Sequence, residues 1–109
     1  MTELREYTDP QGRSPFQQWF EDLDARAAAK VTVALARLQQ GNDSNVRGVG
    51  GGVLELRIDY GPGYRVYFGK DGECLVILLG GGTKKRQNRD IRTAQALWTT
   101  YKARKPQER

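Results

Sequence analysis

Apolar residues recur every three or four positions between residues 14 and 41, which is the spacing of one face of a helix. Ser14 is a favourable N-cap with proline directly after it, and this pair predicts the start of a first helix. Asp24 can cap a second helix, which Gly41 followed by asparagine ends. The apolar faces consist of Phe16, Trp19, Phe20 and Leu23 in the first helix and Ala28, Val31, Leu35 and Leu38 in the second.

The middle of the chain changes to the patterns of β-strands. Strands are predicted at residues 53–60, 64–69 and 75–79, joined by Gly-Pro-Gly and Lys-Asp-Gly-Glu turns that suit hairpins. The third run, Leu-Val-Ile-Leu-Leu, does not alternate, which indicates a strand buried on both faces. A short strand is expected at residues 4–7, and the glycine-rich stretch 46–53 is expected to be a flexible lead-in.

A helical pattern resumes at residues 87–105 through Ile91, Ala94, Trp98 and Tyr101. The expected order is β-α-α-β-β-β-α, an α+β fold with two N-terminal helices packed on an antiparallel sheet and a C-terminal helix. A chain of 109 residues suits one domain, which we place at residues 1–105, with residues 106–109 as a loose tail.

The central hairpin carries two arginines on its polar face. A three-residue Gly-Pro-Gly loop would pair Tyr60 with Tyr64 and set Arg57 opposite Tyr67. The apolar face would then hold Leu56, Ile58, Val66 and Phe68. The polar face would hold Glu55, Arg57, Asp59, Arg65 and Tyr67. This face is either a solvated surface with cross-strand ion pairs or a binding surface.

Composition narrows the classes of function. Hydrophobic residues make up 38% and charged residues 28%, and no stretch approaches the roughly 20 apolar residues of a membrane span. The N-terminal residues lack the apolar core of a secretory signal, so a soluble cytoplasmic protein without a membrane partner is expected. The chain has no histidine, which excludes histidine-based acid–base catalysis and argues against a zinc site; we expect no cofactor. Its one cysteine, Cys74, is expected to be a small buried hydrophobe.

Positive charge is concentrated after residue 45. Residues 1–45 hold five Lys/Arg against seven Asp/Glu, whereas residues 46–109 hold thirteen against six. This asymmetry indicates a polyanionic partner, either nucleic acid or an acidic protein, although a solubility role would give the same count. Arginines at fixed positions on a sheet suit phosphate oxygens, and Tyr67 or Tyr64 can stack on a base.

Two blocks carry a resemblance to a known family. The run GVLELRIDYGPGYRVYF at residues 52–68 is followed by LVILLGGGTKKRQNRDIRTAQAL at residues 75–97. Together they resemble the HigB-like, phage-derived killer-protein branch of the RelE/ParE toxins of bacterial toxin–antitoxin modules. The similarity covers roughly residues 4–102 and includes Gln87, Asp90 and Ile91 of the second block.

The resemblance implies a RelE-like, microbial-ribonuclease-like fold with the helices on one side of an antiparallel sheet. It also implies a type II toxin that acts as a messenger-RNA endoribonuclease on the translating ribosome and is held inactive by a cognate antitoxin. A small helix-turn-helix protein encoded nearby is the expected antitoxin. The family's basic site residues correspond to Arg57, Arg65 and Lys84. Where RelE-type sequences carry a further lysine, this chain has Glu55, and Thr83 replaces the short acidic residue usual before the lysine.

Metal-free RNA cleavage would use the substrate's own 2′-hydroxyl as the nucleophile, with Arg57, Arg65 and Lys84 stabilising the dianionic phosphorane. Glu55 is either the general base or an ion-pair partner that orients Arg57. General RNA or ribosome contacts are expected from Lys85, Arg86 and Arg89. Two rival readings remain: a ParE-type inhibitor of DNA gyrase, and a catalytically inert relative that binds the antitoxin.

Overall fold

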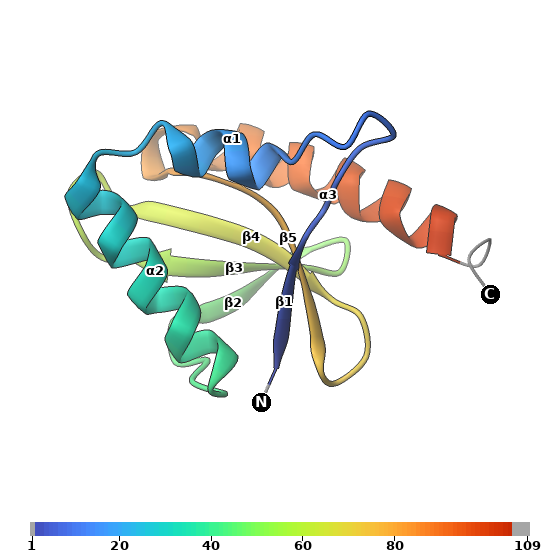
Figure 1. Cartoon of the computed structure of the whole chain (residues 1–109), viewed down its shortest axis with the longest axis horizontal. Coiled ribbons are helices and arrows are strands. Elements are labelled where there is room, and N and C mark those ends of the chain that lie inside the picture. The colour runs from blue at the N-terminus through green and yellow to red at the C-terminus, as the bar shows by residue number, and fades with distance from the viewer. Residues whose placement is uncertain (1, 106–109) are drawn as a thin grey trace.

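The computed structural model describes residues 2–105 (Figure 1). The expected loose tail, residues 106–109, lies outside the described residues. The chain forms an α+β fold, as predicted. Its elements are β1 (Glu3–Glu6), α1 (Pro15–Glu21), α2 (Ala25–Gln39), β2 (Val46–Gly50), β3 (Val53–Ile58), β4 (Tyr64–Lys70), β5 (Leu75–Thr83), the 3₁₀ turn η1 (Lys84–Arg86) and α3 (Gln87–Arg104).

The sheet has five strands in the order β1-β5-β4-β3-β2. The glycine-rich stretch expected to be a flexible lead-in contains β2, which pairs antiparallel with β3. This expectation was wrong because tertiary pairing against β3 overrides the low strand propensity of glycine. The sheet is also not purely antiparallel, since β1 pairs in parallel with β5. These two strands are far apart in the sequence, so no hairpin constrains their direction.

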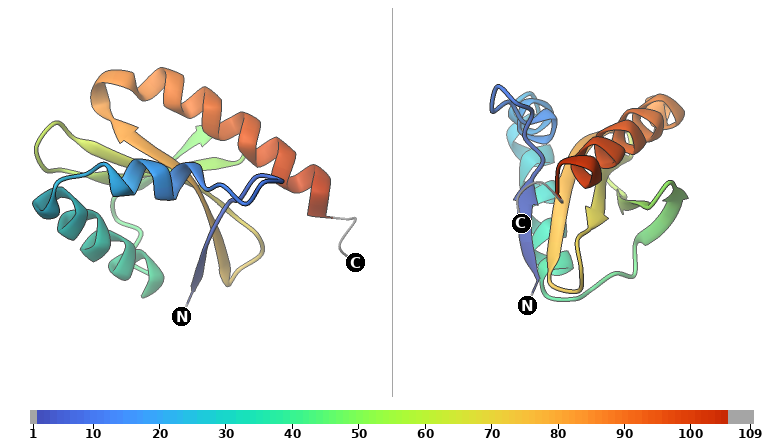
Figure 2. Two further views of the ribbon diagram at one scale, coloured as in Figure 1. Left: turned by 45° about the horizontal axis from the view of Figure 1, so that its top comes forward. Right: turned by 90° about the vertical axis from the view of Figure 1, so that its right-hand side faces the viewer.

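Helices cover both faces of the sheet (Figure 2). One core contains the faces of α1 and α2, and includes Phe16, Val31, Leu56 and Val66. The second core lies under α3. The expectation of helices on one side only is therefore corrected. Because both faces are covered, β5 is buried on both: Val76 and Leu78 face the first core, whereas Ile77 and Leu79 face the second.

The helix starts follow the sequence signals. The Ser14 side chain accepts a hydrogen bond from the backbone N–H of Gln17 at 3.0 Å, and Asp24 accepts one from Ala27 at 2.9 Å. Gly41, with a φ of +94°, follows the last turn of α2 and donates to the Leu38 carbonyl. These caps confirm the predicted starts of α1 and α2 and the end of α2.

Two strand glycines let tryptophans pack directly on the sheet. A Cβ at Gly81 of β5 would lie 2.3 Å from the ring of Trp19 on α1. A Cβ at Gly69 of β4 would lie 2.5 Å from the ring of Trp98 on α3. The absence of side chains at these positions therefore fixes how closely each helix approaches its face of the sheet.

The register of the central hairpin differs from the prediction by two residues. Ile58, not Tyr60, pairs with Tyr64, and Arg57 pairs with Arg65 rather than with Tyr67. The connecting loop is longer than Gly-Pro-Gly because strand pairing ends at Ile58, and the Gly63 N–H donates to the Tyr60 carbonyl at 3.0 Å. A shift of two residues keeps every side chain on its face. The two predicted faces are therefore confirmed although the partners are not.

Cys74 was expected to be buried, but its side chain is exposed. β5 begins only at Leu75, so the cysteine belongs to the turn between β4 and β5. The apolar run that suggested burial starts one residue later.

Candidate functional site

The candidate site begins with a pair of arginines on neighbouring strands. Arg57 of β3 and Arg65 of β4 are directly opposite cross-strand partners. Arg57 is exposed, whereas Arg65 is only 6% exposed. Like charges placed opposite each other destabilise a sheet. An anion in contact with both guanidinium groups would relieve this repulsion.

Lys84 joins the pair from the turn after β5. Its backbone N–H donates to the Gly63 carbonyl at 2.9 Å, which ties η1 to the loop between β3 and β4. Lys84, Arg57 and Arg65 line one open pocket of about 510 Å³, which we call the basic pocket. Its other lining residues are Asn45, Asp59, Gly61, Pro62 and Gly63. Asp59 is the one carboxylate among them, so positive charge dominates the pocket.

Gly63 allows the loop to come close to both cations. It has a φ of +81°, a conformation that residues with side chains rarely adopt. A Cβ at this position would lie 3.3 Å from Nη1 of Arg65 and 3.5 Å from Cβ of Lys84. A larger residue here would strain the loop and crowd the two basic side chains.

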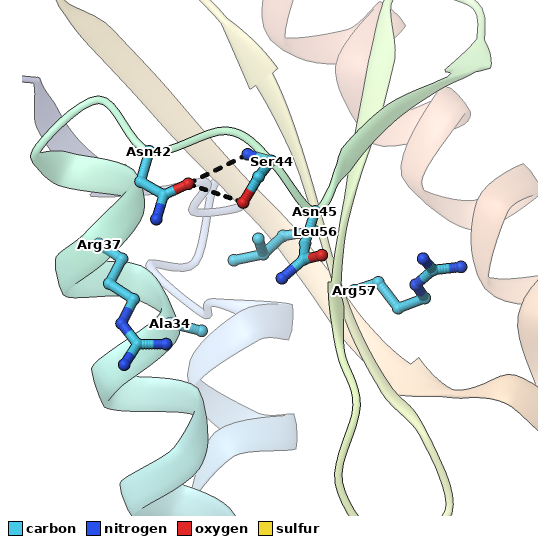
Figure 3. Close-up of a pocket in the computed structure, with 7 residues that line it drawn as sticks. All are labelled: Ala34, Arg37, Asn42, Ser44, Asn45, Leu56 and Arg57. Atoms are coloured by element: carbon cyan, nitrogen blue, oxygen red, sulfur yellow. Dashed lines mark hydrogen bonds between the residues drawn. The ribbon is translucent and has the colours of Figure 1, made fainter.

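A smaller pocket of about 110 Å³ lies between α2 and β3 (Figure 3). Here the Asn42 side chain accepts hydrogen bonds from the backbone and hydroxyl of Ser44, at 3.1 and 2.8 Å. Arg57 borders this pocket as well, but Figure 3 shows its guanidinium pointing away from α2 and Arg37. The charge of Arg57 is therefore directed toward the other side of the sheet.

Glu55 does not lie in the basic pocket. It is 1% exposed and accepts hydrogen bonds from Arg47 Nε at 3.0 Å and Gln87 Nε2 at 2.7 Å. Its Oε1 atom also lies 3.7 Å from Arg65 Nε. A carboxylate enclosed in this way cannot reach a substrate hydroxyl in the pocket, so it is not placed to act as a general base. The alternative, an ion pair with Arg57, is not made either, because Glu55 pairs with Arg47 and Arg65 instead.

Neither tyrosine lines the basic pocket, and Tyr67 is too deeply buried to stack on a base. Tyr67 is 1% exposed because α3 covers its part of the sheet face. Burial, followed by the charges of Glu55 and Asp90, raises the pKa of the Tyr67 hydroxyl above its ordinary value. Tyr64 lies on the opposite face, where its ring contacts Trp19 at a centroid distance of 6.3 Å. The expectation of stacking by Tyr67 is therefore corrected, whereas stacking by Tyr64 stays a prediction.

The remaining cations predicted to contact RNA lie beside the basic pocket rather than in it. Lys85 and Arg86 in η1 and Arg89 in the first turn of α3 are exposed. The pKa of the neighbouring Asp90 is raised by burial and lowered to a lesser degree by Arg89 and Arg86. These side chains extend the positive surface from Lys84 along the start of α3. Their contacts with RNA stay a prediction.

Three residues around the site escaped the sequence analysis. Arg47 was assigned to a flexible segment, and the local sequence gave no strand signal because Val46 and Val49 are three positions apart and do not alternate. Gln87 was noted only as part of a motif, with no role in the site. The local sequence gave no sign that Asn45 belongs to the basic pocket. Its backbone carbonyl accepts a hydrogen bond from the Arg57 N–H at 3.0 Å, and this pairing places Asn45 at the pocket.

Within residues 2–105, no helix is both long and apolar enough to cross a membrane. The same residues contain no group of three or more Cys, Asp or Glu side chains arranged to hold a metal ion.

Comparison with known proteins places the chain in a family. A family model described as "Phage derived protein Gp49-like (DUF891)" matches residues 18–104. An uncharacterized protein of Haemophilus influenzae is 46% identical over 83 residues, which are 75% of this chain and 84% of that protein. The family match spans well over half of the chain and includes every residue of the basic pocket. The chain belongs to the Gp49-like phage-derived family, a toxin-like family of the RelE/HigB type found in toxin–antitoxin modules.

Proposed function

We propose that this chain is the toxin of a type II toxin–antitoxin module and that it cleaves messenger RNA on the ribosome. The observation that carries the proposal is the placement of Arg57, Arg65 and Lys84 around one open pocket. Two of these cations are opposite each other on the sheet and gain from an anion between them. An RNA phosphodiester is such an anion, and planar guanidinium groups bind two of its oxygens at once.

In the proposed reaction the substrate supplies the nucleophile. The 2′-oxygen attacks the adjacent phosphorus, the bond from phosphorus to the 5′-oxygen breaks, and the products are a 2′,3′-cyclic phosphate and a 5′-hydroxyl. Arg57, Arg65 and Lys84 stabilise the additional negative charge of the phosphorane. Removing one such group typically slows electrostatically assisted reactions on the order of 10²–10³-fold.

Two protons move in this reaction. Asp59 takes the role that we first considered for Glu55, because it lines the basic pocket and Glu55 does not. It accepts the proton of the 2′-hydroxyl, while the leaving 5′-oxygen takes a proton from the Lys84 ammonium group or from water. Both groups would be required for full turnover, but neither is required for the protein to fold, since both are exposed.

Partners follow from the same surface and from the family. The exposed Lys85, Arg86 and Arg89 extend the positive charge beyond the pocket, which suits ribosomal RNA on either side of the cut. The membership of a toxin-like family supports a cognate antitoxin, and a helix-turn-helix protein encoded next to this chain is the candidate to test.

The proposal is tested by inducible expression in bacteria. The native chain should arrest growth, and Arg65→Ala and Lys84→Ala should not, while circular dichroism shows that both variants fold. Arg26→Ala is the matched control, because Arg26 is an exposed arginine of α2 that lines neither the basic pocket nor the pocket beside it. Growth arrest by both pocket variants at the native level would contradict the site. Arrest accompanied by loss of DNA supercoiling with intact messenger RNA would point to gyrase instead.

A further inference from the structure

A buried carboxylate lies behind the basic pocket. Glu55 is almost fully enclosed, yet three donors converge on it from three different elements. Gln87 of α3 lies 2.7 Å from Oε2, Arg47 of β2 lies 3.0 Å from Oε1, and Arg65 of β4 approaches Oε1 to 3.7 Å. A buried charge is unfavourable unless it is paired and hydrogen-bonded, and here both oxygens are occupied. The arrangement therefore fixes the carboxylate in one orientation.

Arg65 is the partner through which this cluster reaches the pocket. Its side chain is 7% exposed, and its Nε makes no hydrogen bond within the described part of the chain. The Nη1 atom donates to the Tyr64 carbonyl at 3.3 Å and lies against Gly63, at the wall of the basic pocket. One edge of the guanidinium thus faces Glu55 and another part faces the pocket. The Glu55 carboxylate attracts the Arg65 guanidinium on the side away from the pocket and limits rotation of the Arg65 side chain.

Gln87 connects the same carboxylate to the third cation. It is the first residue of α3 and follows directly on η1, which begins at Lys84. Its hydrogen bond to Glu55 joins residues that are 32 positions apart in the sequence. The start of α3 is thereby attached to β3 at the level of the arginine pair. One carboxylate consequently sets the positions of Arg65 and of the turn that carries Lys84.

We infer that Glu55 is a positioning residue: together with Gln87 it holds Arg65 in the orientation in which its guanidinium faces a phosphate in the basic pocket. The inference rests on the proposed function for the identity of the ligand, but the orientation of Arg65 can be measured without any cleavage. Glu55 transfers no proton and touches no substrate. Its effect on the reaction passes entirely through Arg65 and the start of α3.

The first test observes Arg65 directly. In ¹⁵N-labelled native protein, the side-chain Nε–Hε signal of Arg65 is assigned by comparison with Arg65→Lys. Glu55→Gln should move this signal and weaken the response of Arg65 to added inorganic phosphate at least several-fold. The same signal is measured in Gln87→Ala, which keeps the Glu55 carboxylate but removes its hydrogen bond from α3. If Glu55→Gln does not fold, the result for Gln87→Ala tests the inference. Signals and phosphate responses that match the native protein in these variants would overturn the inference.

The second test separates positioning from a merely structural role. Displacement of a catalytic group by about 1 Å can slow a reaction on the order of 10²-fold. Glu55→Gln should therefore lower kcat of ribosome-dependent RNA cleavage by about that factor and leave KM nearly unchanged. The double variant Glu55→Gln/Gln87→Glu keeps net charge and a carboxylate–amide pair but moves the charge away from β3. We expect it to recover thermal stability without recovering kcat; recovery of both would show that Glu55 acts only in folding.

Arg13→Gln is the matched control, because Arg13 is an exposed arginine that pairs with Asp9 at 2.9 Å, does not contact Glu55 and does not line the basic pocket. It should leave the Arg65 signal and kcat close to native values. A loss as large as that of Glu55→Gln would contradict the inference. If the Arg65 signal and phosphate response change as expected while the native chain cleaves no RNA, the positioning role stands and the proposed nuclease function fails.

Discussion

The facing arginines make a prediction about stability as well as activity. Arg57 lies opposite Arg65, and no carboxylate of residues 2–105 is within ion-pair distance of its guanidinium. Like charges in this arrangement destabilise a sheet by about 0.2–1 kcal/mol. Arg57→Gln removes one of the two charges and keeps a polar side chain of similar length. Its free energy of unfolding should therefore rise by about 0.2–1 kcal/mol.

The expected gain in the stability of Arg57→Gln is measurable by thermal and urea denaturation. In a domain of this size about 1 kcal/mol corresponds to a shift of roughly 4–8 °C in Tm, so a rise of about 1–8 °C is expected. Because the repulsion between the arginines is screened by ions, the gain should shrink as salt is raised from about 0.01 M to about 1 M. The same variant should lose RNA cleavage on the order of 10²–10³-fold, so stability and activity change in opposite directions.

Arg47→Gln provides the comparison, since Arg47 is an arginine of the neighbouring strand whose charge is paired with Glu55 at 3.0 Å. This variant should lose stability rather than gain it. If Arg57→Gln also lowers the free energy of unfolding, with no dependence on salt, Arg57 is stabilising the sheet. The reasoning that the pair is arranged for an anion would then be refuted.

Two further predictions concern the packing of α1 on the sheet and the partly buried carboxylate of Asp90 in the first turn of α3. Gly81→Ala should cost about 1–3 kcal/mol in urea denaturation because its Cβ would lie 2.3 Å from the Trp19 ring, whereas Gly80→Ala, with nothing within 4 Å, should cost much less; equal losses would contradict the packing argument. Asp90→Asn should stabilise the protein at neutral pH, because burial raises the pKa of the Asp90 carboxyl in the folded state. The native protein therefore loses stability as pH rises above the pKa that aspartate has in the unfolded chain, and the asparagine variant does not. The gain should vanish below about pH 3, where aspartate is protonated in both states, and a loss of stability at neutral pH would oppose this reasoning.

Features that depend on neighbouring residues could be predicted from the sequence. The caps at Ser14, Asp24 and Gly41 involve contacts within a few positions, and each is present in the structure. The two-residue period of the strands also placed Arg57 and Arg65 on the correct face. Burial of β5 on both faces followed from its unbroken apolar run.

Features that depend on distant pairing were missed or misplaced. The strand β2 exists because its glycine-rich segment pairs with β3, and no local pattern specifies that partner. A shift of two residues in the β3–β4 hairpin preserves the alternation, so the sequence does not distinguish the two registers. The position of α3 on the opposite face of the sheet from α1 and α2 is likewise a property of the whole chain.

The candidate site likewise combines features that the local sequence predicts with features that depend on distant parts of the chain. Arg57, Arg65 and Lys84 do line one pocket, but their catalytic roles stay predictions. The general-base role of Glu55 and base stacking by Tyr67 do not fit the structure, because strand alternation identifies a face and not what covers it. Tyr67 lies under α3, and Glu55 is enclosed by side chains from two other strands and a helix. Burial of a polar strand position by a distant helix leaves no trace in the local sequence.

The central claim is that the basic pocket cuts messenger RNA, and the most direct test is made in a purified translation system. The protein is added to ribosomes that carry a defined message, and new RNA ends are mapped with and without ribosomes. We expect cuts that require ribosomes, leave 2′,3′-cyclic or 3′-phosphate ends, and disappear with Arg65→Ala but persist with Arg26→Ala. An intact message in the presence of folded native protein would contradict it.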